Sequence, residues 1–277
     1  MSLSVFLLVL FAALLHAAWN AWVKSEEDRF GSILRLAAGQ SVLAAFLLPF
    51  FKLPAAHVWP WIAASAALHT GYKAFLIAAY EKGDLSQVYP LARGTAPMIV
   101  AAAGMIFLAE VPPPLRLAAV VAIGTGILLM AGGRGRLSGT ALLLAMGTAA
   151  FTASYTLVDG NGARVSGNAS AFILWAIALD GPLMLAYGVA ARGTSASFAP
   201  LRSGWRQGLA AGATSAGAYW IVVWAFTQAP LAIVAALRET SVLFAMLIAA
   251  FLLREKVAPR RWAAAGLIVV GLVLMRL

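Results

Sequence analysis

The chain is a succession of apolar segments that alternate with short polar connections. Ten of the segments are long enough to cross a bilayer, because a hydrocarbon core of about 30 Å needs roughly 20 residues of helix. Charged residues, glycine and proline fill the connections, and we expect the longest of these, Arg192–Trp205, to lie along the membrane interface. We therefore predict an all-α polytopic membrane protein with ten transmembrane helices, at residues 3–23, 32–51, 58–80, 87–108, 115–132, 138–158, 169–191, 206–226, 231–253 and 259–275.

The second half of the chain repeats the first at a spacing of 145 residues. Coincidences of alanine or leucine mean little among membrane helices, but charged residues and prolines in register indicate a duplicated unit. Each unit holds five predicted helices, an odd number, so the second unit must lie upside down relative to the first. We expect two inverted five-helix repeats, residues 1–133 and 134–277, on the strength of the pairs Arg93/Arg238, Glu110/Glu255, Pro114/Pro259 and Arg116/Arg261.

The composition agrees with this interpretation. Hydrophobic residues make up 62% of the chain and charged residues 11%, whereas a soluble domain is about 25% charged. The net charge of +10 comes from single basic residues between apolar runs, so we expect no nucleic-acid partner. Because the chain has no cysteine, disulfides and cysteine-ligated metal sites are excluded.

The basic residues of the connections predict an orientation. Most of them follow the odd-numbered segments, and the opposite side holds only Lys52, Arg116, Arg164 and Arg276. Cytoplasmic loops of membrane proteins carry the excess of Lys and Arg. We therefore expect a multi-pass protein of the bacterial inner membrane with both termini in the periplasm.

Two arginines lie inside apolar segments. Arg93 is about six residues into its segment and Arg238 about seven, so each lies roughly 10 Å deep at about 1.5 Å per residue. Inversion of the repeats makes them enter from opposite faces and bracket the midplane about 10 Å apart, where transporters built from repeats bind their substrates. A charge at that depth costs at least about 2.5–3.5 kcal/mol unless it is compensated. The alternative is that each arginine is structural and pairs with Asp180 or Glu239.

Asp180 and Glu239 are the acids that we assign to proton coupling or to a counter-ion role. Asp180 precedes Gly181-Pro182 near the centre of its segment, where a carboxyl group must pair with a cation or titrate. Glu239 and Arg238 point about 100° apart on a helix, so we do not expect them to pair with each other. Lys73 is the expected partner of Glu239, and we favour Glu239 as the group that binds and releases a proton in each cycle.

Polar and aromatic residues recur at helical spacing and predict the face of a cavity. His16 and Asn20 share one face of the first segment, and His69 and Lys73 share one face of the third. Threonines of the sixth segment usually bond to their own backbone, which leaves Tyr155 and Asp159 more open there. We predict a substrate site that consists of Arg93, Arg238, Lys73, His16, Trp19, Asn20, Tyr72, Tyr89, Tyr155, Tyr219 and Trp220.

Signals for catalysis and for metal binding are weak. His16 and His69 have no third ligand at a suitable spacing. Neither a nucleophile–base arrangement nor a phosphate-binding glycine loop is evident. We therefore expect a protein that is not an enzyme and that holds no metal and no cofactor.

Each half of the chain contains a glutamate in a turn after an apolar helix, Phe107-Leu108-Ala109-Glu110 and Leu252-Leu253-Arg254-Glu255, followed by a proline and a last helix with glycine. In these features, and over nearly its whole length, the chain resembles the ten-helix EamA branch of the drug/metabolite transporter superfamily. The resemblance implies a central cavity that opens alternately to each side and carries small metabolites. The small multidrug members of the superfamily couple protons through a glutamate in their first helix. The first segment here has no acid, so their mode of coupling does not carry over.

We expect a secondary transporter that moves a small polar metabolite by alternating access. The predicted segments hold Lys73, Arg93 and Arg238 against Asp180 and Glu239, a surplus of one positive charge. An anionic or zwitterionic solute, such as an amino-acid-like or phosphonate-like one, would balance it. The expected partners are this small molecule and membrane lipid, and the expected state is a monomer or weak homodimer. The alternatives are a flippase for lipid-linked head groups and a non-transporting subunit of a membrane complex.

Overall fold

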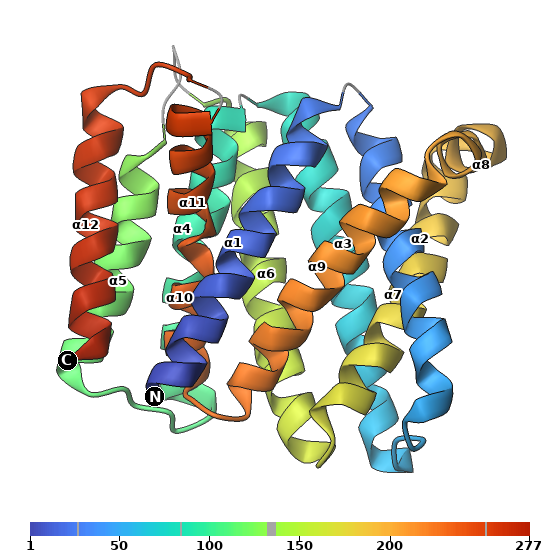
Figure 1. Ribbon diagram of the computed structural model, residues 1–277, viewed down its shortest axis with the longest axis horizontal. Coiled ribbons are helices and arrows are strands. Elements are labelled where there is room, and N and C mark those ends of the chain that lie inside the picture. The colour runs from blue at the N-terminus through green and yellow to red at the C-terminus, as the bar shows by residue number, and fades with distance from the viewer. Residues whose placement is uncertain (27, 84, 132–136, 253) are drawn as a thin grey trace.

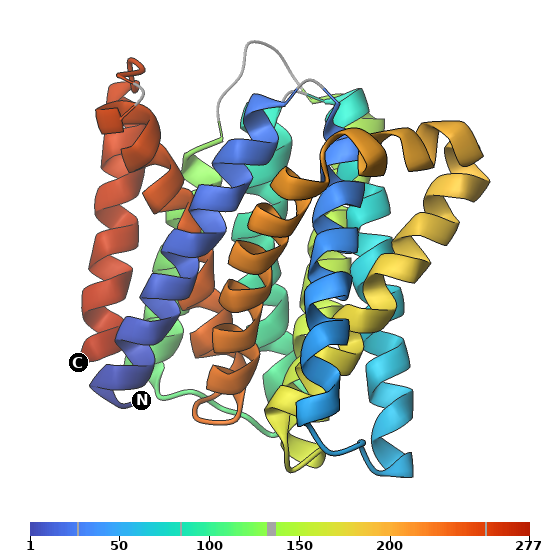
Figure 2. The same ribbon diagram turned by 45° about the vertical axis from the view of Figure 1, so that its right-hand side comes forward.

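The protein is a bundle of helices that run between two ends of the molecule (Figures 1 and 2). The computed structural model describes residues 1–26, 28–83, 85–131, 137–252 and 254–277. Both chain termini lie at one end, here called the terminal end; the other is the opposite end (Figure 1). In chain order the helices are α1 (Leu3–Ser25), α2 (Arg29–Leu47), η1 (Leu48–Phe50), η2 (Ala56–Val58), α3 (Trp59–Lys82), α4 (Leu85–Phe107), α5 (Pro114–Leu129), α6 (Gly139–Val165), α7 (Ala169–Arg192), α8 (Thr194–Ser203), α9 (Trp205–Phe226), α10 (Leu231–Glu239), α11 (Ser241–Leu247), η3 (Ile248–Leu252) and α12 (Pro259–Arg276).

Eight helical segments of the described chain are long and apolar enough to cross a membrane. They are α1, α2, α3, α4, α6, α7, α9 and the run of α10, α11 and η3. The helix α5 is shorter, with 16 residues, and α12 carries three arginines within its 18 residues. The short helix α8 occupies the long connection before α9 and lies at the opposite end of the bundle (Figure 1). The expected boundary between the two repeats, at residues 133 and 134, lies outside the described residues.

Helix α6 is longer than the sequence predicts, because it continues past residue 158 to Val165. The predicted segment ends before Asp159, because the apolar run gives way there to charge and glycine. In the structure Asp159 is only 1% exposed, and side chains of α3 bind its carboxylate. The extension places Arg164 in the last turn of α6, at the terminal end.

The predicted helix at residues 231–253 is interrupted at Thr240, which separates α10 from α11. The backbone N–H of Thr240 donates to the Leu237 carbonyl oxygen at 3.2 Å, and its hydroxyl donates to the same oxygen at 2.7 Å. A hydroxyl that bonds back to its own helix weakens the regular hydrogen-bond ladder. This bond of Thr240 accounts for the break, which directly follows Glu239, a residue of the site described below.

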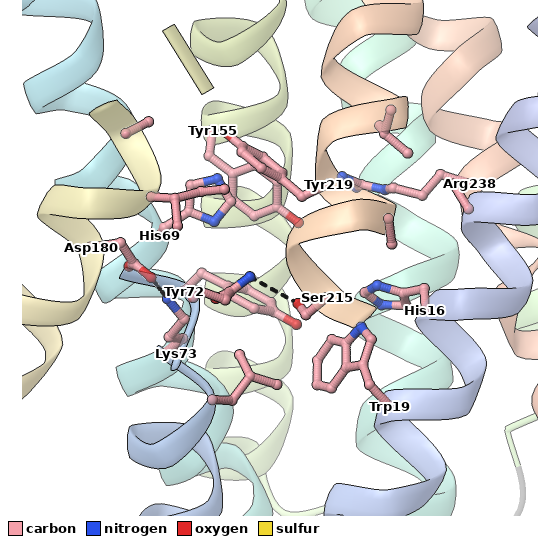
Figure 3. A pocket seen from close by; sticks show the side chains of 17 residues that line it. His16, Trp19, His69, Tyr72, Lys73, Tyr155, Asp180, Ser215, Tyr219 and Arg238 are labelled. Atoms are coloured by element: carbon pink, nitrogen blue, oxygen red, sulfur yellow. Dashed lines mark hydrogen bonds and ion pairs between the residues drawn. The ribbon is translucent and has the colours of Figure 1, made fainter. Parts of the chain in front are cut away.

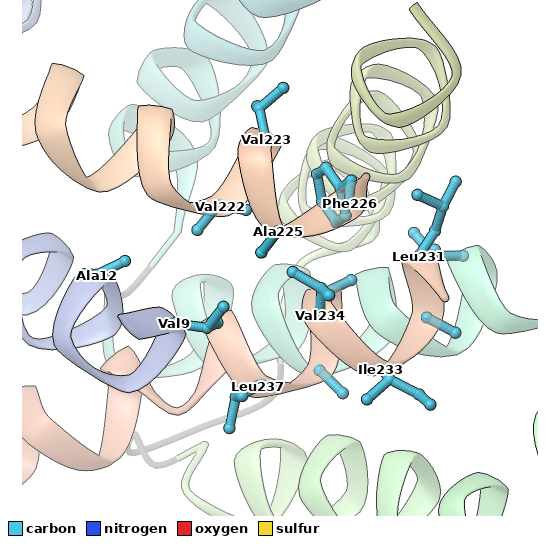
Figure 4. Close-up of a cluster of buried hydrophobic side chains, with 14 of the residues drawn as sticks. Val9, Ala12, Val222, Val223, Ala225, Phe226, Leu231, Ile233, Val234 and Leu237 are labelled. Atoms are coloured by element: carbon cyan, nitrogen blue, oxygen red, sulfur yellow. The ribbon is translucent and has the colours of Figure 1, made fainter. Parts of the chain in front are cut away.

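An apolar core fills the space between α1, α9 and α10 toward the terminal end (Figure 4). All nine residues of α10 are buried. Val9 of α1, Val223 of α9 and Val234 of α10 each have no exposed surface. This packing closes the bundle between its centre and the terminal end.

An ion pair joins three parts of the chain at the same end. Glu110, in the turn after α4, forms an ion pair with Arg164 of α6, and its other carboxylate oxygen accepts from the backbone N–H of Leu231, the first residue of α10, at 2.9 Å. Arg164 also donates to the carbonyl oxygens of Phe226 and Ala229, at 2.8 and 3.1 Å. The carboxylate thus caps the N-terminus of α10, where a negative charge is favoured.

Helices α5 and α12 pack against each other through a reciprocal contact. A Cβ atom built on Gly126 would lie 2.7 Å from Cγ1 of Ile268, and one built on Gly271 would lie 2.6 Å from Cγ1 of Ile123. Only glycine allows the two backbones to approach so closely. Each helix therefore presents a glycine to an isoleucine of the other.

Candidate functional site

A cavity of about 90 Å³ lies in the middle of the bundle. Its volume is that of about three water molecules at roughly 30 Å³ each, so it fits part of a small solute. Its walls come from α1, α2, α3, α6, α7, α9 and α10. The polar and aromatic residues that line it are His16, Trp19, Gln40, His69, Tyr72, Lys73, Tyr155, Asp180, Ser215, Tyr219 and Arg238 (Figure 3).

A wider vestibule of about 430 Å³ adjoins this cavity. Trp19, Leu36, Tyr72 and Lys73 line both spaces. The outer residues of the vestibule belong to helix ends and connections at the opposite end of the molecule, namely Arg29, Tyr80, Ser86, Met130, Glu255, Lys256 and Arg261. The structure is therefore open from the cavity toward the opposite end and closed by the apolar core toward the terminal end.

Arg93, Glu239 and Arg238 form a buried cluster beside the cavity. Nε of Arg93 lies 2.5 Å from one carboxylate oxygen of Glu239, and Nη2 of Arg238 lies 2.9 Å from the other. Arg93 also donates from Nη2 to Nε2 of His16 at 3.1 Å. Glu239 has no exposed surface and Arg93 is 2% exposed. Among the three, Arg238 lines the cavity, and its guanidinium carbon lies 5.5 Å from the centre of the Tyr155 ring.

Two expectations about this cluster are wrong. Arg238 and Glu239 do bond to each other, because their long side chains bend toward the same side at the end of α10. Both guanidinium groups contact the one carboxylate of Glu239, which is the structural pairing given above as the alternative for the two arginines. The second cation at Glu239 is Arg93 and not Lys73.

Lys73 instead forms an ion pair with Asp180 across the cavity wall between α3 and α7. Both side chains are at least nine-tenths buried and both line the cavity. The second carboxylate oxygen of Asp180, Oδ1, is buried and makes no hydrogen bond within the described part of the chain. Figure 3 shows this pair on the side of the cavity away from Arg238 and His16.

Asp159 belongs to a third buried group that the sequence analysis did not assign to the site. His69 of α3 places Nε2 at 3.0 Å from Oδ2 of Asp159, and Ser65 donates to Oδ1 at 2.5 Å. The His69 ring stacks on Tyr155 with centroids 4.1 Å apart and meets the edge of Tyr219 at 5.2 Å. The spacing of four residues between Tyr155 and Asp159 on one helix face is the sequence signal for this group.

The buried charges of the described residues sum to zero while the histidines are neutral. Three are positive and three negative, which differs from the predicted surplus of one positive charge because that sum omits Asp159. Protonation of His69 would restore the surplus. The six charged residues are Lys73, Arg93, Arg238, Asp159, Asp180 and Glu239.

The other predicted site residues are divided between the two spaces. Trp19 and Tyr72 line both, and Tyr155 and Tyr219 line the cavity. Asn20 and Tyr89 line the vestibule. The indole nitrogen of Trp19 is buried without a hydrogen bond among the described residues. Trp220 lies elsewhere: it donates to the Ser170 hydroxyl at 3.1 Å and packs against Phe51.

Gln40 and Ser215 line the cavity as well, joined by a hydrogen bond of 3.1 Å between α2 and α9. The sequence analysis missed them, because single polar residues in apolar segments carry no periodic signal. Lys24 follows Asn20 by four residues, as Asn20 follows His16, and its side chain is outside the described part of the structure.

A comparison with protein families shows which family the chain belongs to. A model of the EamA-like transporter family matches residues 139–277, which is half of the chain. The chain belongs to the EamA-like transporter family. It is therefore a multi-pass membrane protein of the drug/metabolite transporter type, in agreement with the resemblance found in the sequence. No curated protein matches the chain.

The fold of this EamA-like protein is shared with a solved structure over nearly its full length. A protein known only as "Crystal structure of protein" superposes with a TM-score of 0.77, covering 99% of this chain and 98% of the other. The two sequences are 17% identical, so the likeness concerns the fold alone.

Proposed function

We propose that the protein is a secondary transporter of a small zwitterionic solute, which it moves across the bacterial inner membrane by alternating access. The observation that carries the proposal is the placement of Arg238 and Asp180 on opposite sides of one cavity (Figure 3). An arginine donates two parallel hydrogen bonds to a carboxylate or phosphonate. A buried carboxylate with one oxygen unbonded accepts from an ammonium group.

The charge around the cavity supports a zwitterion over a simple anion. On one side Arg93, Arg238 and Glu239 together carry one positive charge. On the other side the carboxylate of Asp180 is neutralised by Lys73 but keeps Oδ1 without a partner among the described residues. An anion alone would leave that buried oxygen unsatisfied, at a penalty of about 1–3 kcal/mol. A solute with an acidic and an amino group satisfies both sides.

Aromatic residues of the cavity complete the proposed site. The faces of tyrosine rings attract an ammonium group, and Tyr72, Tyr155 and Tyr219 lie between the two charged sides (Figure 3). The buried indole N–H of Trp19 is a donor for an oxygen of the solute. In this scheme Glu239 is a counter-ion that holds Arg238 in place, and Asp180 is both the counter-ion of Lys73 and the acceptor for the solute.

We also propose that α5 and α12 cross the membrane, which gives ten spans in two inverted repeats, residues 1–133 and 134–277. The turn before each of these helices has the same unusual backbone: Ala109 has a φ of 51° and Arg254 a φ of 55°, and the two positions are 145 residues apart. The glutamates that follow donate their N–H groups to carbonyl oxygens six residues earlier, at 3.0 Å from Gly104 and 2.9 Å from Ala249.

The packing of the helices supports the same proposal. Two contacts between the halves of the chain each have a counterpart. The contact of α3 with α6 corresponds to that of α9 with α1, and the contact of α2 with α9 corresponds to that of α7 with α3. These are the pairs that a two-fold axis in the membrane plane would exchange. The reciprocal contact of α5 and α12 lies on that axis, and both termini at one end fit an even number of spans (Figure 1). With the termini in the periplasm, as the loop charges predict, the vestibule opens to the cytoplasm.

The two repeated glutamates suggest how the openings alternate. Glu110 ties α6 and α10 together at the closed terminal end. Glu255, 145 residues later, lines the open vestibule together with Arg29 and Ser86. Ser86 lies in the first turn of α4. It corresponds to Leu231 of α10 in the repeat, since the two are 145 residues apart. We propose that Glu255 caps α4 when the vestibule closes, as Glu110 caps α10 here, and that Glu110 then releases its partners.

Counterflow in liposomes that contain this protein alone tests the function. The liposomes are loaded with unlabelled solute, and entry of the labelled solute is measured for L-alanine and 2-aminoethylphosphonate as zwitterions, propionate as an anion and choline as a cation. The proposal expects saturable counterflow of at least one zwitterion and none of choline. Arg238→Ala should remove that counterflow, whereas Arg202→Ala, a variant at an exposed arginine of α8, should not.

Two results would contradict the proposal. One is counterflow of choline but of neither zwitterion. The other is the absence of counterflow for every solute, from a preparation that is folded by gel filtration and thermal unfolding, which would favour a flippase or a non-transporting subunit.

A further inference from the structure

We propose that Asp159 and His69 form a proton-binding site that couples solute movement to a proton gradient. This inference rests on the proposed transport function and assigns the binding of its coupling ion to Asp159 and His69. In this proposal Glu239 and Asp180 are counter-ions at the cavity and do not bind the coupled proton.

The geometry distinguishes Asp159 from the other two buried acids. Glu239 contacts two guanidinium groups, and Asp180 is paired with the ammonium group of Lys73. Both of these carboxylates therefore already have a cationic partner. Within the described part of the chain no lysine or arginine pairs with Asp159; the Ser65 hydroxyl and the His69 ring bond to its carboxylate, and the Tyr219 hydroxyl also interacts with it. Histidine is the side chain that changes charge between about pH 5 and 8.

Burial makes the proton of this pair important. Asp159 is 1% exposed, and a buried carboxylate without a cation is strongly disfavoured. One proton on the pair, carried by His69 as an imidazolium or shared with Asp159, removes the uncompensated charge. Loss of that proton leaves a buried negative charge beside the cavity, held by the hydroxyl groups of Ser65 and Tyr219 and by a neutral ring. The pair therefore has two states that differ by one full charge.

Among the residues that the structure describes, the groups that face the His69 ring from the neighbouring helices do not supply a competing cation at contact distance. From α6 the ring meets Asp159 and Tyr155, and from α9 it meets Tyr219. From α7 the nearest charged residue of the cavity is Asp180, which is paired with Lys73, one turn from His69 on α3. From α10 the guanidinium group of Arg238 lies over the ring of Tyr155, on which His69 stacks.

The position of the pair allows the solute to sense the proton. His69 lines the cavity, and Asp159 lies behind it, outside the lining residues. Figure 3 shows His69 stacked on Tyr155 on the same side as Asp180 and Lys73. A protonated pair adds one positive charge where the ammonium end of a zwitterion is proposed to bind. Binding of the proton therefore weakens binding of the solute, and binding of the solute weakens binding of the proton. We expect one proton to leave the site as one solute enters it, which is antiport.

The test separates exchange from driven transport. Counterflow requires only that the loaded carrier reorients, whereas accumulation against a gradient requires that the proton is bound and released in each cycle. In liposomes with an imposed pH gradient, wild-type protein should accumulate labelled L-alanine or 2-aminoethylphosphonate, and a pH-sensitive dye should report proton movement in the opposite direction. Asp159→Asn keeps the size of the side chain and its bond to Ser65. It should retain counterflow of the same solute and lose both accumulation and proton movement.

His69→Gln is the second variant, which covers the case in which Asp159→Asn fails to fold, and it should also lose accumulation and proton movement. His57→Gln is the matched control, since His57 is exposed in η2, and it should behave as wild type. Accumulation by Asp159→Asn or His69→Gln at the wild-type level would overturn the proposal. Proton movement in the same direction as the solute would overturn antiport.

A solute-independent readout keeps this proposal distinct from the proposed function. In ¹⁵N spectra of the protein in nanodiscs, the imidazole signals that are missing from His69→Gln belong to His69. The proposal expects these signals to change with pH. If wild-type protein exchanges neither zwitterion but His69 titrates, the solute class is wrong and the proton site stands. If exchange occurs and His69 does not titrate, the proton site is wrong and the transport function stands.

Discussion

Replacing Glu239 with glutamine should destabilise the protein more than any other single loss of a carboxylate. The substitution leaves the guanidinium groups of Arg93 and Arg238 adjacent, and these are 2% and 7% exposed. Removing one partner of a buried ion pair costs about 3–5 kcal/mol, because the remaining charge stays buried. Since about 1.4 kcal/mol is a factor of ten, the ratio of folded to unfolded protein should fall by roughly two to more than three orders of magnitude.

Two further variants make the argument quantitative. Arg93→Met combined with Glu239→Gln removes one of the stranded cations and should recover at least about half of the loss, because the deficit comes from unpaired buried charge. Glu81→Gln removes the same kind of group from the exposed ion pair with Arg192, where the Glu81 side chain is 53% exposed. This control should change the free energy of unfolding by no more than about 1 kcal/mol.

Equilibrium unfolding in mixed micelles, followed by tryptophan fluorescence, measures all of these variants on one scale. The reasoning would be refuted if Glu239→Gln lost no more stability than Glu81→Gln. It would also be refuted if the Arg93→Met change added to the loss when combined with Glu239→Gln. Either result would mean that the cluster does not depend on mutual compensation of charge.

The remaining predictions concern the solute site and the two ends of the molecule. Arg238→Lys keeps the charge but loses the planar fork, so counterflow of the zwitterion should fall more than about tenfold; unchanged counterflow would show that geometry is unimportant there. Glu255→Gln should slow turnover while the concentration for half-maximal counterflow stays the same, as expected if it acts only in the closed vestibule. Because the chain has no cysteine, Ala229→Cys gives a unique label site; Glu110→Gln should speed its reaction with an impermeant maleimide from the terminal side, and an unaltered rate would argue against the role of the Glu110 ion pair.

The apolar periodicity predicts the helices well because each helix is a local property of about 20 residues. Burial of charge is not local, and this is where the sequence analysis goes wrong. Asp159 looks like the end of a helix until Ser65 and His69, which lie 94 and 90 residues away in the chain, are placed against it. No periodicity along α6 contains that information.

The same limit explains the predictions at Glu239. The angle of about 100° between consecutive residues on a helix describes the directions of Cα–Cβ bonds, and it excludes contact only for short side chains. Arginine and glutamate are long, and Arg93 from α4 draws the Glu239 carboxylate to a position that Arg238 also reaches. Lys73 is therefore free to pair with Asp180, 107 residues away. The types of residue at the site were predictable from their depth, but their pairing required the tertiary structure.

Direct binding to the purified protein tests the central claim, that the cavity holds a zwitterion between Arg238 and Asp180. Calorimetry compares L-alanine with propionate and ethylamine, and 2-aminoethylphosphonate with ethylphosphonate and ethylamine, so that each analogue lacks one charge. At least one zwitterion should bind more tightly than both of its analogues; Arg238→Ala should abolish its advantage over the amine, and Asp180→Asn its advantage over the anion. Equal binding of a zwitterion and its anionic analogue by the wild-type protein, for both sets, would contradict the account.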